Sequence, residues 1–201
     1  DILQRNIELL NDTRQFIAEA GTAPLDKLTV LLEKIQNRIA DLPPSKRQII
    51  EKQILKTRGV IEERGAKELA LIYMELYMAP DAEALTVLNK SITNLQRALA
   101  LLEKVNASQN AVEALKRHIA ILNESRLLIE AWIRGDLEKA KEHQNRLEQI
   151  LSGAPDFVKK VIESKIGGIT KAVRERGAGA STPWPSNVSP PKGSGGRGPN
   201  K

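Results

Sequence analysis

The stretches LLNDTRQFI at residues 9–17 and ILNESRLLI at residues 121–129 are nearly the same nine residues, 112 positions apart. Aligned without a gap at this offset, residues 1–65 lie over residues 113–177 and share 16 identities in 65 positions. Exchanges between similar residues, such as Asp12 with Glu124 and Thr13 with Ser125, extend the match. We interpret this similarity as a tandem duplication within the chain.

Each copy is predicted to form three helices. The first helix of the first copy carries a face at three-four spacing, which we expect to point inward. This face consists of Leu3, Ile7, Leu10, Arg14 and Ile17.

Glycine, proline and hydroxyl residues predict where the other helices begin and end. A second helix is expected from about residue 25 to residue 40. A third should follow LPPS at residues 42–45, with Ser45 and Gln48 forming a capping box. Gly65 would then close it as a left-handed C-terminal cap. The second copy has different breakers at matched positions, namely residues 135–136, residues 152–156 and Gly177.

The predicted fold is therefore all-α, with two homologous three-helix repeats at residues 1–65 and 113–177. A helical hairpin at residues 66–112, split at residues 79–81, is expected to join them. Residues 178–201 are rich in Gly, Pro and Ser and form a non-helical C-terminal arm. Two hypotheses remain open for the arm. It is a disordered tail or linker, or it orders on a neighbouring subunit with Trp184 as its anchor.

The composition favours helices packed on helices. Aromatic residues make up only 3% of the chain, and Leu, Ile, Ala and Val supply the apolar side chains. The absence of cysteine excludes disulfides and thiolate chemistry. No stretch approaches the roughly 18 apolar residues that would indicate a membrane-spanning helix.

No pattern in the sequence indicates an enzyme. The two histidines, His118 and His143, align with Asn6 and Leu31, and neither belongs to a known metal-ligand motif. The acidic residues are scattered among Lys and Arg at helical spacing, as on a solvated face. The glycine-rich KGSGGRG at residues 192–198 follows no strand and lacks the ending of a phosphate-binding loop. We therefore expect no catalytic residue, no cofactor and no metal site.

The positive charge is a weak indication of nucleic-acid binding. The net charge is +6, of which the arm contributes half through Lys192, Arg197 and Lys201. No run of basic residues with interleaved aromatics occurs in the rest of the chain. A basic coat or packaging protein for nucleic acid is kept as an alternative.

The Asn-x-Ser/Thr motif is more frequent than composition alone explains, and it occurs at Asn11, Asn89, Asn106, Asn123 and Asn187. One interpretation is N-glycosylation, with Asn106 and Asn187 as the more accessible acceptors. This would favour a secreted, cell-surface or virion protein over a cytoplasmic one, and would suit removal of a leader before Asp1. The other interpretation is a repeated helical motif.

The motif at Asn11 also allows a structural interpretation. A semi-buried Asn followed by an acid, a hydroxyl and an Arg could form a polar network that fixes helix register. The candidate residues are Asn11 with Arg14 in the first copy and Asn123 with Arg126 in the second.

These observations favour a non-enzymatic structural protein, a self-associating subunit of a filament, coat or surface assembly. We expect a homo-oligomer formed through the repeat faces and the C-terminal arm. Tyr73 and Tyr77, four apart on one predicted helix, and Trp184 are the candidate contact residues. Core packing is the alternative for the two tyrosines. The alternative function is a helical adaptor that binds another protein.

Overall fold

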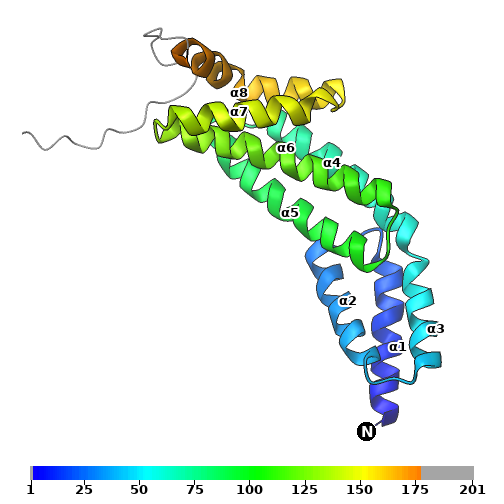
Figure 1. Cartoon of the computed structure of the whole chain (residues 1–201). Helices are drawn as coiled ribbons and strands as arrows, with labels where there is room; N and C mark the ends of the chain where they lie inside the picture. The colour runs from blue at the N-terminus through cyan, green and yellow to red at the C-terminus, as the bar shows by residue number, and fades with distance from the viewer. Residues whose placement is uncertain (1, 178–201) are drawn as a thin grey trace, which may run out of the picture. The chain divides into compact units, whose positions relative to one another are not determined.

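The computed structural model describes residues 2–177, and the described residues form helices without a β-strand (Figure 1). The predicted all-α class is therefore confirmed. The expected arm, with Trp184 and Asn187, lies outside the described residues. In chain order the elements are α1 (Ile2–Glu19), α2 (Leu25–Ile39), α3 (Pro44–Leu55), α4 (Arg58–Met78), the 3-10 turn η1 (Asp81–Glu83), α5 (Ala84–Lys104), α6 (Gln109–Ile133), α7 (Leu137–Ser152) and α8 (Asp156–Gly177).

Prolines and one aspartate mark several helix starts. Pro24, Pro43 and Pro80 precede α2, α3 and η1 with φ between −59° and −52°, because the ring fixes this angle. Before α7, Asp136 Oδ1 accepts a hydrogen bond from the backbone N–H of Lys139 at 3.1 Å. This bond also holds the pKa of the Asp136 carboxyl below its ordinary value. The helix breaks expected at residues 79–81, 135–136 and 152–156 are confirmed.

Two expected helix ends are wrong. α3 begins at Pro44 with no side-chain cap, so Ser45 and Gln48 form no capping box. Gly65 lies inside α4, and the helix break comes earlier, at residues 56–57. There the Thr57 N–H and hydroxyl donate to the carbonyl three residues back, at 3.0 and 2.7 Å. These bonds tighten the last turn of α3 and satisfy the buried Thr57 hydroxyl without a glycine.

The chain packs as two compact units, and α4, α5 and α6 each pass from one unit to the other. Among the described residues, the first unit comprises residues 2–72 and 90–119. In it α1 packs beside α2 and α3 (Figure 1). Asp12 on α1 joins this helix to α2 through Lys34 at 3.0 Å and Arg38 at 2.8 Å. The core of the unit includes Phe16, Leu28, Leu32, Ile35, Ile61, Leu95 and Leu101.

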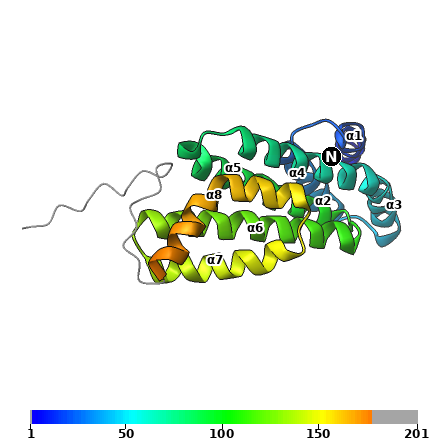
Figure 2. The same ribbon diagram turned by 90° about the horizontal axis from the view of Figure 1, so that it is seen from above.

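Among the described residues, the second unit comprises residues 73–89 and 120–177. Here α7 and α8 lie side by side (Figures 1 and 2). The Arg176 guanidinium lies 5.0 Å from the centre of the buried Trp132 ring, which joins α8 to α6. Lys165 donates to the carbonyl of Ala79 at 2.6 Å and so holds α8 at the end of α4. The core of the unit includes Tyr73, Leu76, Leu128, Val158, Ile162 and Ile169.

Candidate functional site

The apolar face of α1 that we expected to point inward is exposed. Leu3, Ile7, Leu10 and Ile17, called here the α1 stripe, expose 67%, 45%, 59% and 40% of their surfaces. Arg14 lies among them and is exposed as well. The expected inward direction was therefore wrong.

A different face of α1 is buried against its neighbours. Leu9 and Phe16 fill it with apolar surface, and Asp12 and Thr13 are buried beside them. Asp12 is tolerated there because two α2 cations pair with it, and the Thr13 hydroxyl donates to the Leu9 carbonyl at 2.8 Å. A face with two polar residues is hard to recognise as the inward one from the sequence.

The matching face of α6 has the opposite environment. Leu115, Leu122 and Ile129, each 112 residues after a member of the α1 stripe, expose 2%, 0% and 7%. Ile119 is half-buried. The same pattern is thus covered by protein on α6 and open on α1.

The two predicted register-fixing pairs also differ in environment. Asn11 and Arg14 are exposed on α1, so the semi-buried setting expected for Asn11 was wrong. On α6, the half-buried Arg126 donates to Asn123 Oδ1 and to Glu130 Oε1, both at 2.9 Å. A polar network of the expected kind forms there, and its effect on register stays a prediction.

The two tyrosines proposed as contact residues lie in different environments. Tyr73 is 1% exposed, and its ring meets Phe157 edge to face with centroids 5.8 Å apart. This burial raises the pKa of the Tyr73 hydroxyl. Tyr77, one turn later, is 57% exposed. Tyr73 is therefore a core residue, and Tyr77 alone remains available for contacts.

Tyr77 belongs to a second exposed apolar surface. Met74 and Met78 are 64% and 77% exposed on α4, and Phe157 at the start of α8 is 53% exposed beside Tyr73. We call Met74, Tyr77, Met78 and Phe157 the α4–α8 patch. Sequence reasoning missed three of its members. The available signal was that the only two methionines of the chain lie four residues apart on either side of Tyr77.

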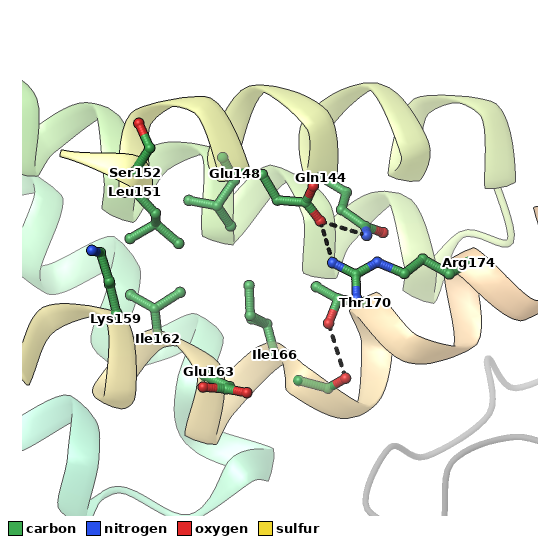
Figure 3. Close-up of a pocket in the computed structure, with 12 residues that line it drawn as sticks. Gln144, Glu148, Leu151, Ser152, Lys159, Ile162, Glu163, Ile166, Thr170 and Arg174 are labelled. Atoms are coloured by element: carbon green, nitrogen blue, oxygen red, sulfur yellow. Dashed lines mark hydrogen bonds and ion pairs between the residues drawn. The ribbon is translucent and has the colours of Figure 1, made fainter. Parts of the chain in front are cut away.

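A shallow groove of about 330 Å³ lies between α7 and α8 (Figure 3). Its apolar part is formed by Leu147, Leu151, Ile162 and Ile166. Figure 3 shows Leu151, Ile162 and Ile166 directed into the space between the two helices. The groove offers apolar contact and no nucleophile paired with a base.

One end of the groove is closed by a polar cluster. Arg174 donates to Glu148 Oε1 at 2.6 Å, and Gln144 donates to the same oxygen at 2.9 Å (Figure 3). The Gln144 bond and then the Arg174 bond lower the pKa of the Glu148 carboxyl. Gln144 itself is 4% exposed, and its Oε1 has no hydrogen-bond partner among the described residues. The cluster connects α7 to α8 across the groove.

The two histidines lie on different helices, His118 on α6 and His143 on α7. His143 Nδ1 lies 2.7 Å from Glu124 Oε2, which links α7 to α6. His118 is half-buried, and this burial, with the nearby Arg117, lowers its pKa. Residues 2–177 contain no group of three or more His, Cys, Asp or Glu side chains that could hold a metal ion.

Of the two candidate glycosylation sites, the structure describes one. Asn106 is exposed and has φ of +50° in the turn after α5. Its backbone carbonyl accepts a hydrogen bond from Arg58 at 3.4 Å. Asn187, like Trp184, lies outside the described residues.

Comparison with known proteins does not assign the chain to a family. No family model, no curated protein and no solved structure matches it. Within residues 2–177, no helix is both long and apolar enough to cross a lipid bilayer. The α1 stripe, the α4–α8 patch and the α7–α8 groove are candidate binding surfaces of the described residues.

Proposed function

We propose that this chain is a self-associating structural subunit, which assembles with copies of itself into a filament, coat or surface layer. The observation that carries the proposal is the exposed α1 stripe. Its four aliphatic side chains follow the three-four spacing with which helices pack against other helices. Exposed aliphatic side chains gathered on one helix face are typical of a surface that binds another molecule.

The size of the stripe sets the strength of the contact. Its members together expose the area of about two whole aliphatic side chains. Burying each whole side chain stabilises by roughly 1.5–3 kcal/mol, so the stripe contributes about 3–6 kcal/mol. Association costs about 4–15 kcal/mol. The stripe alone therefore does not offset this cost over most of the range, and the opposing surface must add apolar area of its own.

The proposed duplication supports an assembling role. α2 and α7 begin at Leu25 and Leu137, and α3 and α8 begin at Pro44 and Asp156, each pair 112 residues apart. The third helices differ in length, because α3 stops at residue 55 and α8 continues to residue 177. A contact between two different surfaces of one chain continues from copy to copy.

Sedimentation velocity over a concentration series from micromolar to millimolar chain tests this function. We expect the mean mass to rise with concentration, and Leu10→Glu to reduce that rise because it places a charge in the stripe. Asn37→Glu adds the same charge at an exposed position of α2 and serves as the control. A chain that stays monomeric at every concentration would overturn the proposal.

A helical adaptor is the second candidate function, and the α7–α8 groove favours it. The groove has an apolar part formed by Leu147, Leu151, Ile162 and Ile166, and its volume lies at the lower end of the roughly 300–1,000 Å³ of small-ligand sites. Its shape suits one face of an amphipathic helix. The concentration series separates the two functions, because an adaptor stays monomeric until its partner is added.

A further inference from the structure

The positive charge of the described residues is concentrated at α3. Residues 44–58, from the start of α3 to the first residue of α4, hold five cations and one acid, Glu51. The rest of residues 2–177 holds 23 cations and 23 acids. The acids that follow on α4 are occupied, because Glu62 accepts from a backbone N–H after α5 at 2.6 Å and Glu63 pairs with a lysine one turn later at 2.7 Å. The net charge therefore belongs to one short stretch of the first unit.

The lysines of this stretch lie on its exposed side. α3 packs beside α1 and buries Ile50 and Ile54 (Figure 1). Lys46, Lys52 and Lys56 are exposed, and among the described residues they form no ion pair. Three ammonium groups are thus left to solvent on α3 and its C-terminal cap.

The exposed side of α3 also carries apolar side chains. Ile49 is 60% exposed, and Leu55 is 39% exposed. Ile49 lies three residues after Lys46 and three before Lys52, so these side chains are neighbours on one helix face. We call Lys46, Ile49, Lys52, Leu55 and Lys56 the α3 face. It is both cationic and apolar.

The two acids nearest the α3 face do not neutralise it. Glu51 directly precedes Lys52 and is therefore turned about 100° away from it around the helix. Asp41, in the loop before α3, lines a hollow together with the exposed Arg5 and Lys46. One acid in that hollow meets two cations, so the face remains positive.

We infer that the α3 face binds the surface of a lipid bilayer that contains anionic phospholipids. Basic amphipathic helices bind in this way, because their cations meet the lipid phosphates while their aliphatic groups enter the boundary between headgroups and acyl chains. Each lysine held near such a surface strengthens binding about 5-fold. The inference goes beyond the proposed self-association and does not depend on it.

A nucleic acid would match the charge of the α3 face but would leave its apolar groups without a partner. Nucleic acids are held by cations on the phosphates and by aromatic stacking or arginine contacts on the bases. α3 has no aromatic residue, and its one arginine, Arg47, donates to three carbonyls at and after the end of α2. Ile49 and Leu55 instead favour a lipid boundary.

Flotation of the full chain with vesicles tests the inference, because assemblies of the chain alone do not float. One set of vesicles is phosphatidylcholine, and the other contains an equal part of phosphatidylserine. The test variant carries Lys52→Gln and Lys56→Gln. Its matched control carries Lys160→Gln and Lys171→Gln, which remove two exposed α8 lysines that form no ion pair among the described residues.

A second pair of variants tests the apolar contact. Ile49→Gln removes the aliphatic group at the centre of the α3 face, and Val30→Gln removes one that is 64% exposed on α2. All substituted positions are exposed, so circular dichroism and thermal unfolding should match the unmodified chain. The residues after Gly177 are the same in every variant, so their charge does not distinguish one variant from another.

We expect the unmodified chain to float with the phosphatidylserine vesicles and not with phosphatidylcholine alone. Loss of Lys52 and Lys56 should weaken this binding about 30-fold, and Ile49→Gln should weaken it about 5- to 20-fold. Both controls should bind like the unmodified chain, and added salt should weaken binding because it screens the lysines.

Four outcomes overturn the inference. The chain does not float with either vesicle, or it floats equally with both. The α3 and α8 lysine pairs lose binding equally, which would indicate unspecific attraction by net charge. Ile49→Gln binds vesicles unchanged, while the unmodified chain shifts duplex DNA in a gel and the α3 lysine variant does not; the partner is then a nucleic acid. None of these outcomes changes the sedimentation result on which the proposed function depends.

Discussion

Leu10 and Leu122 occupy the same position in the two proposed copies, but Leu10 is 59% exposed and Leu122 is fully buried. Replacing each by Ala removes the same atoms from two different environments. We expect Leu122→Ala to lower the free energy of unfolding by about 2–5 kcal/mol, because it leaves a cavity in a packed core. Leu10→Ala should change it by less than about 0.5 kcal/mol, since the side chain is largely in water and Ala favours the helix.

For self-association we expect the reverse: Leu10→Ala should have the larger effect on the dissociation constant, and Leu122→Ala the smaller. Burial of the exposed part of Leu10, at roughly 1.5–3 kcal/mol for a whole side chain, contributes about 1–2 kcal/mol to a contact. Its loss raises the dissociation constant about 5- to 30-fold. Leu122→Ala should leave the dissociation constant of the folded chain unchanged, because this residue reaches no surface.

Urea denaturation followed by circular dichroism, at a chain concentration low enough to give monomers, measures the first effect. Sedimentation velocity at higher concentration measures the second. A Leu10→Ala variant that loses as much unfolding free energy as Leu122→Ala would show that the α1 stripe is buried after all. A stable Leu10→Ala variant with unchanged association would remove the stripe from the assembly contact.

Three further changes test the position of Gly65 in α4, the titration of His118 and the contribution of the two methionines to assembly. Gly65→Ala should raise the free energy of unfolding by about 0.5–1 kcal/mol, because glycine is unfavourable inside a helix; a loss in urea denaturation would place Gly65 at a left-handed cap instead. The lowered pKa of His118 means that folding disfavours its proton, so stability should fall as pH drops below about 6.5. His118→Asn should make the urea midpoint less sensitive to acid, and an equal acid sensitivity in the variant would count against this assignment. Mild peroxide should weaken assembly by making Met74 and Met78 polar sulfoxides, and a variant with leucine at both positions should resist the treatment in sedimentation.

Helix boundaries were largely predictable because local chemistry decides them. Proline fixes φ wherever it occurs, so the starts after Pro24, Pro43 and Pro80 follow from three residues alone. Gly65 was misread because glycine is tolerated inside a helix when packing stabilises the surrounding turns. The real end of α3 depends on the buried Thr57 hydroxyl, and its burial is a property of the folded unit.

The direction of an apolar face was not predictable in the same way. The α1 stripe and its counterpart on α6 have identical residues at identical spacing, yet one is exposed and the other is largely buried. Periodicity indicates that a helix has an apolar face, whereas neighbouring helices decide whether that face is covered. For the same reason, spacing alone placed Tyr73 and Tyr77 on one face, although Tyr73 is buried in the core and Tyr77 is exposed to solvent.

The residues of the α1 stripe recur at the matched positions of α6. The two copies differ at most of their aligned positions, yet they are identical at every position of the expected face, namely Leu3, Ile7, Leu10, Arg14 and Ile17. On α6 the packed core accounts for the aliphatic side chains. On α1 the fold does not, because exposed helix positions accept polar residues at a cost of about 0.5 kcal/mol or less. We propose that a surface outside the monomer, on a second copy of the chain, covers these side chains.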